Sequence, residues 1–220
     1  MIRALVFDFD GLIVDTEVPV YQAWAEVYER HGEVLSADFW ATIIGYGNDH
    51  FDPVAELERR VGRELDREAI RAARRRRQAE LTLALEILPG VREWWQEARA
   101  RGLGLGVASS SLRAWVVGHL ERLGLEGADC VRCQEDVERT KPAPDLYLAV
   151  LDCLGVSASE AVAIEDSGVG VLAAKAAGLY CVAVPSAMTG SHDFGSADLI
   201  VPSLAELPLA ALEQRVLQNG

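Results

Sequence analysis

Five short apolar runs, each flanked by polar or turn-forming residues, recur along the chain and predict buried strands. They cover residues 4–7, 105–108, 161–164, 181–184 and 199–201. Segments of helical length, bounded by Gly, Pro or Ser, separate these runs and cover residues 91–101, 112–123, 144–154 and 169–177. Strands that alternate with helices indicate a parallel sheet with right-handed crossovers and helices on both faces. The sequence therefore predicts a doubly wound α/β fold.

Residues 17–85 interrupt this alternation. They hold helix-like segments at residues 21–31, 37–44, 53–61 and 67–83, and no convincing strand. We expect an all-helical cap domain of residues 17–85, inserted into a core domain of residues 1–16 and 86–220. The two connections, at residues 15–17 and 86–90, would then act as hinges.

Charge narrows the possible partners. The 220 residues include 34 acidic and 21 basic side chains, which gives a formal net charge of −13. Such a charge argues against general affinity for nucleic acid or an anionic membrane. No apolar run approaches the roughly 18 residues that span a bilayer. We expect neither partner, and because nothing marks an interface we expect a monomer.

The four cysteines follow no disulfide framework, which is typical of a reduced, cytosolic setting. Nothing targets the chain outward, so we expect a cytoplasmic protein. Cys130 and Cys133 form a lone CxxC pair. A redox or metal role for this pair is disfavoured, because no second pair or His cluster completes a zinc site.

Acidic residues follow two of the predicted strands. Asp8 and Asp10 come directly after the first, and both face one crevice because residues two apart on a strand point the same way. Glu165 and Asp166 follow another strand. If these strands are neighbours, the carboxylates converge, and an oxygen-only cluster selects a hard cation, usually Mg²⁺, with Lys141 balancing the remaining charge. For Asp8 and Asp10 alone, an acidic turn without function remains the alternative.

Ser109 follows another predicted strand and precedes a helix. A hydroxyl with free backbone N–H groups at a helix start makes an anion site. An ordinary N-cap, which Ser110 or Ser111 can also supply, is the simpler explanation of this serine taken alone.

Four segments, in order along the chain, resemble the motifs of the haloacid dehalogenase-like superfamily. They are DFDGLIVDT at residues 8–16, AS at 108–109, KPAPD at 141–145 and EDSGVG at 165–170. The resemblance covers the whole chain and is closest to the branch of β-phosphoglucomutase, phosphoglycolate phosphatase and sugar-phosphate phosphatases, whose helical cap follows the first motif. It implies a Mg²⁺-dependent phosphatase that hydrolyses a small phosphorylated metabolite, a sugar or polyol phosphate, through an aspartyl-phosphate intermediate.

The resemblance also implies a role for each motif residue. Asp8 would be the nucleophile. Asp10 would protonate the leaving oxygen and then activate water. Ser109 and Lys141 would hold the transferred phosphoryl group. The implied magnesium ligands are Asp8, Asp10 (through its backbone carbonyl), Glu165 and Asp166.

Two departures from the mutases of this branch favour a phosphatase. Where these mutases carry a His that controls proton delivery, this chain has Val20, and its loop near residue 49 lacks their phosphate-binding Arg. Asp10 argues against dehalogenation, because the name-giving dehalogenases lack this second acid. A phosphomutase that needs a bisphosphorylated activator and a non-catalytic sensor of a phospho-ligand remain the alternatives.

In this branch the cap selects the substrate, so we expect cap residues to contact the leaving group. The candidates are Glu17, Tyr46, Asn48, His50 and one arginine of the run at 74–77, taken as Arg76. The run covers more than one helical turn, so at least one arginine must face whatever the helix packs against or overhangs. A solvated helix face is the alternative. The tryptophans, Trp115 among them, are expected to serve packing.

Overall fold

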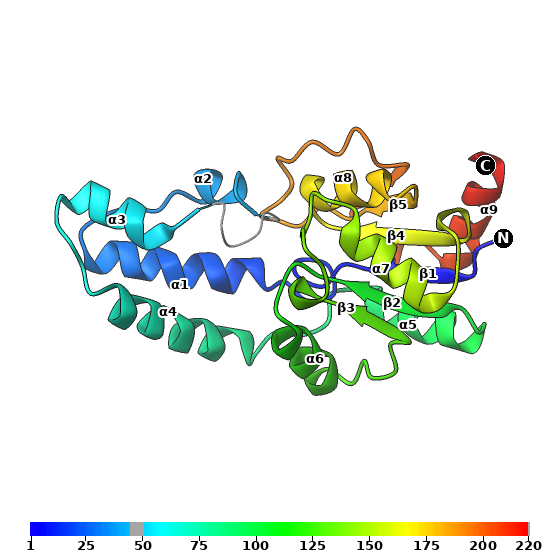
Figure 1. Cartoon of the computed structure of the whole chain (residues 1–220), viewed down its shortest axis with the longest axis horizontal. Coiled ribbons are helices and arrows are strands. Elements are labelled where there is room, and N and C mark those ends of the chain that lie inside the picture. The colour runs from blue at the N-terminus through cyan, green and yellow to red at the C-terminus, as the bar shows by residue number, and fades with distance from the viewer. Residues whose placement is uncertain (45–50, 220) are drawn as a thin grey trace.

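The computed structural model describes residues 1–44 and 51–219, and a six-stranded parallel sheet forms its core (Figure 1). The strands are β1 (Ala4–Phe7), β2 (Gly104–Ala108), β3 (Cys130–Arg132), β4 (Ala161–Glu165), β5 (Tyr180–Ala183) and β6 (Leu199–Ile200). Their order across the sheet is β3-β2-β1-β4-β5-β6. Phe7 of β1 pairs with Val107 of β2 and with Ile164 of β4. Side chains that follow these three strands therefore gather at one edge of the sheet.

Two groups of helices cover the two faces of the sheet. On one face lie α5 (Val91–Ala100), α6 (Arg113–Arg122) and α9 (Leu209–Asn219), and on the other lie α7 (Asp145–Leu154) and α8 (Gly168–Ala176). Side chains of β1 point alternately to the two faces. Leu5 and Phe7 pack in the apolar cluster with α5, α6 and α9, and Ala4 and Val6 pack in the cluster with α7 and α8. Short 3-10 turns occur at Gln134–Asp136, Ala158–Glu160 and Leu204–Glu206. The predicted doubly wound α/β fold is confirmed.

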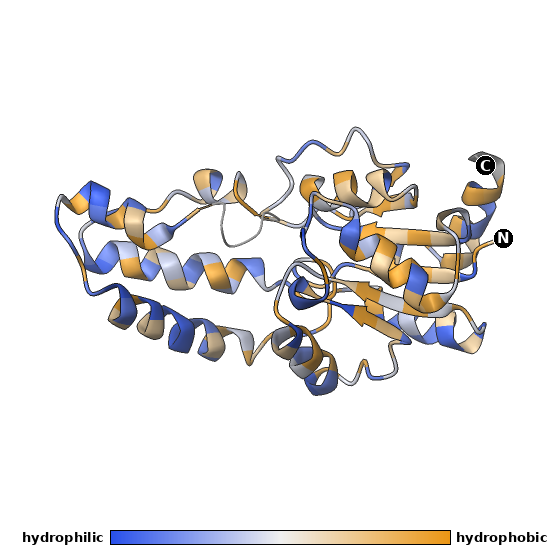
Figure 2. Ribbon diagram, viewed as in Figure 1, coloured by the Kyte–Doolittle hydropathy of each residue, from blue (hydrophilic) through white to orange (hydrophobic). Residues whose placement is uncertain are grey.

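Among the described residues, four helices lie between β1 and α5 in the sequence. They form a group at the end of the molecule away from the sheet (Figure 1). They are α1 (Glu17–Arg30), α2 (Ala37–Ala41), α3 (Pro53–Val61) and α4 (Arg67–Thr82). Asp52 and Asp66 cap α3 and α4 by accepting backbone N–H bonds. The helices enclose their own apolar cluster, which includes Trp24, Tyr28 and Trp40. Hydrophilic residues dominate α4, whereas hydrophobic residues dominate the strands (Figure 2).

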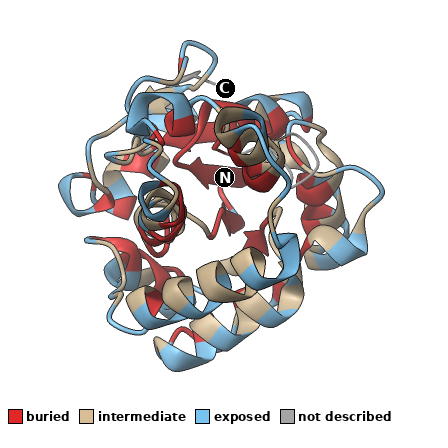
Figure 3. Cartoon of the chain, turned by 90° about the vertical axis from the view of Figure 1, so that its left-hand side faces the viewer, coloured by how far each residue is buried: buried red, intermediate tan, exposed pale blue. Residues whose placement is uncertain are grey.

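Burial follows these layers. Seen from the end where the α1 to α4 helices lie, buried residues gather on the strands and on the inner faces of the surrounding helices (Figure 3). Within the described ranges, no helix has the length and apolar character needed to cross a bilayer.

Two elements and one covalent link depart from the sequence-based expectations. β3 has only three residues, of which Val131 and Arg132 are half-buried, so no apolar run marks it. The amphipathic helix α9 was also not predicted. The expectation that the cysteines form no disulfide is wrong, because Cys130 of β3 is bonded to Cys153 of α7, with 6.2 Å between their Cα atoms. The two cysteines meet because α7 packs against β3, a tertiary contact that their spacing in the sequence does not reveal.

Candidate active site

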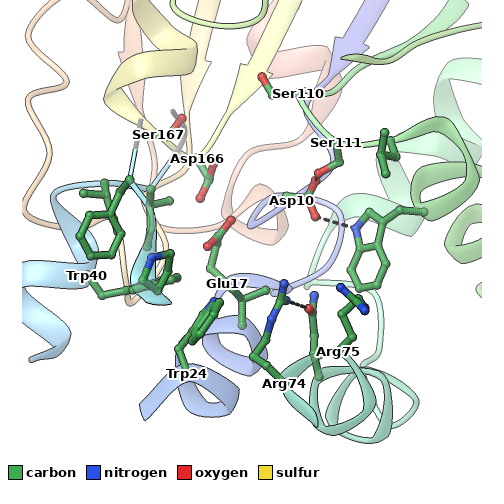
Figure 4. A pocket seen from close by; sticks show the side chains of 18 of the residues that line it. Asp10, Glu17, Trp24, Trp40, Arg74, Arg75, Ser110, Ser111, Asp166 and Ser167 are labelled. Carbon is green, nitrogen blue, oxygen red and sulfur yellow. Dashed lines mark hydrogen bonds between the residues drawn. The ribbon is translucent and has the colours of Figure 1, made fainter. Parts of the chain in front are cut away.

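A cavity of about 630 Å³ lies where the carboxyl ends of β1, β2 and β4 face α1, α2 and α4 (Figure 4). Asp8, Asp10, Lys141 and Asp166 line it, as does Glu17 of α1. Two further residues singled out in the sequence lie beside this lining. Ser109 bonds to Asp10, and Glu165 bonds to Lys141.

Asp8 and Lys141 form a buried ion pair. Asp8 follows β1 directly, and its N–H donates to the backbone oxygen of Ile164 at 2.9 Å. Nζ of Lys141 donates to the Asp8 carboxylate and, at 2.6 Å, to Oε1 of Glu165. Burial raises the pKa of Asp8 to about 8, although the positive charge of Lys141 acts to lower it. Burial lowers the pKa of Lys141, but Asp8 and Glu165 outweigh this effect and hold it above its usual range, so the lysine stays charged.

Glu165 is held by three side chains. Its Oε1 accepts hydrogen bonds from Lys141 and, at 2.5 Å, from the Tyr147 hydroxyl on α7, while Oε2 accepts from Ser167 at 3.3 Å. A Cβ atom at Gly170 of α8 would overlap the Glu165 carboxylate, so a larger residue there would displace this side chain. Glu165 is therefore fixed in place and orients Lys141.

One carboxylate oxygen of Asp166 differs from the other site oxygens described so far. This oxygen, Oδ2, is buried and has no hydrogen-bond partner among the described residues. One carboxylate oxygen each from Asp8, Glu165 and Asp166 lie within 4.8 Å of one another. Burial and the charges of Asp8 and Glu165 raise the pKa of Asp166 well above its usual range. An all-oxygen cluster with excess negative charge and an unpartnered oxygen fits a hard divalent cation.

The Asp10 carboxylate accepts four hydrogen bonds. Its Oδ1 accepts from Thr16 at 2.7 Å and from the indole N–H of Trp115 at 2.9 Å. Its Oδ2 accepts from Ser111 at 2.6 Å and from Ser109 at 3.2 Å. These donors come from the segments after β1 and β2 and from α6, so Asp10 is oriented from several sides.

The turn between Asp8 and α1 depends on Gly11. Its φ of 86° lies in the left-handed region that favours glycine, and a Cβ atom there would overlap the Asp166 carboxylate. The turn thus brings the segment after β1 close to the segment after β4.

Ser109 is fully buried, and its hydroxyl accepts the N–H of Ser111 at 3.0 Å. Helix α6 begins only at Arg113, after Leu112, so Ser109 is not its N-cap. Ser110 lines the cavity, and its buried hydroxyl has no partner among the residues that the structure describes. The segment after β2 therefore presents polar groups to the cavity without using them to start the helix.

The cap candidates divide into three groups. Glu17 lines the cavity, and burial, followed by the charges of Asp10, Asp8 and Asp15, raises its pKa to about 8. Tyr46, Asn48 and His50 lie outside the described residues. Arg76 is exposed and is not among the residues that line the cavity.

The orientation of α4 determines which of its arginines line the cavity. Arg71, Arg74, Arg75 and Gln78 stand three and four residues apart, which places them on one face of the helix, and all four line the cavity. Arg76 falls outside that stripe. Choosing among consecutive arginines requires the helix orientation, which the run itself does not contain.

Trp115 and Tyr147 belong to the site but were not singled out for chemistry from the sequence. Trp115 was expected to serve packing, although it lies in the first turn of α6, the helix that follows β2. Tyr147 follows Asp145 in the third motif by two residues and carried no signal of its own. Both act as hydrogen-bond donors to carboxylates of the site.

Comparison with known proteins places the chain among relatives of one family. A family model described as haloacid dehalogenase-like hydrolase matches residues 2–178. The chain is 43% identical over 213 residues to "Putative phosphatase YhcW" of Bacillus subtilis, covering 96% of each protein. It is 32% identical over 180 residues to the "Phosphorylated carbohydrates phosphatase" of Thermotoga maritima, covering 80% of this chain and 82% of that protein. The crystal structure of β-phosphoglucomutase from Clostridium difficile shares its fold, with a TM-score of 0.81 at 23% identity over 100% of this chain and 99% of that one.

Proposed function

The chain belongs to the haloacid dehalogenase-like hydrolases, and from that membership and its site we propose a Mg²⁺-dependent phosphatase that hydrolyses a small phosphorylated metabolite through an aspartyl-phosphate on Asp8. The names of its phosphatase relatives support phosphate monoesters, and the Thermotoga relative supports a sugar or polyol phosphate. The observation that carries the proposal is the placement of Asp8, which is buried, is paired with Lys141 and has a carboxylate oxygen within 4.8 Å of one on Asp166.

Asp8 and Asp166 would hold the magnesium ion, together with the backbone carbonyl of Asp10. Glu165, which the resemblance implied as a further ligand, would instead hold Lys141 in place, since its oxygens already accept hydrogen bonds from Lys141, Tyr147 and Ser167. When bound, Mg²⁺ neutralises charge on the phosphoryl oxygens and orients the phosphate.

The reaction would proceed in two displacements. A carboxylate oxygen of Asp8 bonds to phosphorus while the bond to the leaving oxygen breaks, and Asp10 gives that oxygen a proton. Water then bonds to phosphorus, Asp10 takes its proton, and the bond to Asp8 breaks, which frees phosphate and restores both carboxyl groups. Lys141 and Ser109 would bind the transferred phosphoryl group throughout.

Asp10 is positioned by groups that suit proton transfer in this scheme. Three of the four groups that bond to its carboxyl are hydroxyls, which can accept as well as donate, so these contacts can persist when Asp10 carries a proton. We propose that residues 17–85 act as a cap whose closure over the substrate excludes stray water.

Hydrolysis is favoured over phosphomutase chemistry because of Val20. This residue lines the cavity and offers no group that donates or accepts a proton. A mutase would move the phosphoryl group to another hydroxyl of a sugar phosphate and would need a bisphosphorylated activator. A non-catalytic sensor would turn over no compound at all.

The test is phosphate release from a panel of phosphorylated metabolites, with and without Mg²⁺, by the native protein and by Asp8→Asn. Release that requires Mg²⁺ and vanishes in the variant supports the proposal. The control is Asp38→Asn, at an exposed aspartate of α2, which should release phosphate like the native protein. Metal-dependent release by Asp8→Asn would refute the assigned nucleophile, and isomer formation without phosphate release would indicate a mutase.

A further inference from the structure

One of the four groups that bond to the Asp10 carboxyl differs from the others. Three are the hydroxyls of Thr16, Ser109 and Ser111, and a hydroxyl can donate or accept a hydrogen bond. The fourth is the indole N–H of Trp115, which can only donate. The indole nitrogen lies 2.9 Å from Oδ1 of Asp10. Trp115 therefore requires this oxygen to remain an acceptor.

Core packing does not account for the position of Trp115. On α6, Val116 and Leu120 are buried, whereas Trp115 is half-buried and lines the cavity. Its ring packs against the ring of His119, with 4.2 Å between the centroids, and Nδ1 of His119 lies 3.0 Å from the backbone oxygen of Trp115. These contacts hold the indole at the cavity wall, where its N–H reaches Asp10.

The start of α6 is also anchored to the segment that follows β3. The N–H of Arg113 donates to both carboxylate oxygens of Glu135, at 3.0 and 3.1 Å, and the Arg113 guanidinium pairs with Asp136. β3 in turn pairs with β2. The first turn of α6, which carries Trp115, is therefore fixed relative to the sheet before a ligand binds.

The two carboxyl oxygens of Asp10 are consequently not equivalent. A proton on Oδ1 would make this oxygen a weaker acceptor, and the bond from Trp115 cannot reverse its direction. Oδ2 bonds only to the hydroxyls of Ser109 and Ser111 among the described residues, and either hydroxyl can turn to accept a hydrogen bond from a protonated Oδ2. The contacts of Asp10 thus favour a proton on Oδ2.

We propose that Trp115 is a positioning residue for proton transfer, whose N–H holds Oδ1 of Asp10 so that Oδ2 gives and takes the proton. In the first displacement the Oδ2–H bond breaks, its electron pair stays on the Asp10 carboxylate, and the proton passes to the leaving oxygen. In the second, Oδ2 takes a proton from the attacking water. This inference rests on the proposed phosphatase function and assigns a role to a residue that was expected to serve packing.

Trp115→Phe tests this role, because it removes the N–H and keeps an aromatic ring. We would compare kcat/KM, which covers the steps up to the phosphorylated enzyme, for phenyl phosphate and p-nitrophenyl phosphate with Mg²⁺. Phenolate is the more basic leaving group and depends more on a proton from Asp10. The variant should lose roughly tenfold or more on phenyl phosphate and less than about twofold on p-nitrophenyl phosphate.

The matched control is Trp94→Phe. The N–H of Trp94 donates to the backbone oxygen of Leu207 at 2.8 Å, and neither residue lines the active-site cavity. This variant loses a buried hydrogen bond without touching Asp10, so it should keep the native ratio of the two kcat/KM values. Equal losses on both compounds in Trp115→Phe, or no loss on either, overturn the inference, because a purely structural role affects both compounds alike.

NMR of the metal-free protein tests the contact without turnover. The chain has five tryptophans, and ¹⁵N labelling gives each indole N–H its own signal. The signal that disappears in Trp115→Phe identifies this indole, and it should move upfield in Asp10→Ala because its acceptor is gone. An unchanged signal overturns the inference. If the native protein hydrolyses neither compound with Mg²⁺, the proposed phosphatase fails instead, so the two claims can fail separately.

Discussion

The cavity has two ends, one at the carboxyl ends of β1, β2 and β4 (the sheet end) and one lined by α1, α2 and α4 of the proposed cap (the cap end), and these ends differ in how their charged side chains are held. At the sheet end, Lys141, Glu165 and Asp10 each make two or more hydrogen bonds, so they are held in place before a ligand arrives, although Oγ of Ser110 and Oδ2 of Asp166 lack a partner among the described residues. At the cap end, Arg74 and Trp40 keep buried N–H groups that no described residue accepts. Prearranged groups favour one fixed reaction, whereas unpartnered groups favour selection among ligands. Substitutions should therefore abolish chemistry at the first end and alter selectivity at the second.

The largest expected contrast is between Asp8→Asn and Arg74→Met. We expect Asp8→Asn to lower kcat by about 10⁴-fold or more for every substrate, because the nucleophile is lost. Arg74→Met should leave kcat for a monophosphate nearly unchanged. Steady-state kinetics of the two variants on the same monophosphate measures the contrast, and circular dichroism verifies that both variants are folded. A general loss of activity in Arg74→Met would erase the distinction between the two ends.

Lys141→Met should lower the stability of the folded protein, because Lys141 is a buried cation shared by two carboxylates. Removing this buried cation leaves Asp8 and Glu165 without their shared partner, which costs about 3–5 kcal/mol in the free energy of unfolding. Lys175→Met is the control, because Lys175 forms a partly exposed ion pair with Asp198 and should cost about 1 kcal/mol or less. Urea unfolding without Mg²⁺ gives both values. Similar losses in the two variants would contradict the central role of Lys141.

Stability of the metal-free protein should fall as the pH rises from about 4 to about 8. In this range the folded protein binds more protons than the unfolded chain, because burial raises the pKa of Asp8 from 3.8 to about 8. Thermal unfolding in a chelator measures this slope. Asp8→Asn should make the slope shallower without removing it, because the pKa values of Glu17 and Asp166 are also raised. Mg²⁺, which binds the ionised carboxylates, should reverse the slope. A metal-free protein that becomes more stable over this range would contradict the account.

The smallest expected effect concerns His192, which links the start of α8 to α2. Its Nδ1 accepts the N–H of Gly168 at 3.2 Å, and its Nε2 lies 2.6 Å from the backbone oxygen of Ala41 on α2. His192→Gln can keep the donor to Ala41, whereas His192→Asn can keep only the acceptor for Gly168. If the contact with α2 holds the cap closed, KM should rise roughly two- to tenfold in the Asn variant and stay near the native value in the Gln variant. Identical KM values in both variants would show that the contact does not matter.

The sheet end was largely predictable because its residues occupy strand ends. Apolar runs fixed the positions of β1, β2 and β4, and in a parallel sheet the residues that follow such strands meet at one edge. Local pattern therefore placed Asp8 and Glu165 at strand ends, but their convergence also required β1 and β4 to be neighbours, which the structure shows. β3 did not, because a short and partly exposed strand carries no apolar run.

The cap end was less predictable because it depends on tertiary orientation. Residues 74–77 showed that an arginine must face inward, but the way α4 packs on α1 decides that Arg74 and Arg75 do so and Arg76 does not. For the same reason, the sequence did not predict the hydrogen bond from Trp115 to Asp10 or the disulfide between Cys130 and Cys153. In each case the two groups meet only after distant elements have packed.

Trapping of the covalent intermediate tests the central claim most directly. Borohydride reduces an aspartyl-phosphate to homoserine, which peptide mass spectrometry locates in the chain. The account predicts homoserine at position 8 when the protein turns over a substrate with Mg²⁺, and none when the substrate is left out. Homoserine at another aspartate, or its absence during active turnover, would contradict nucleophilic attack by Asp8.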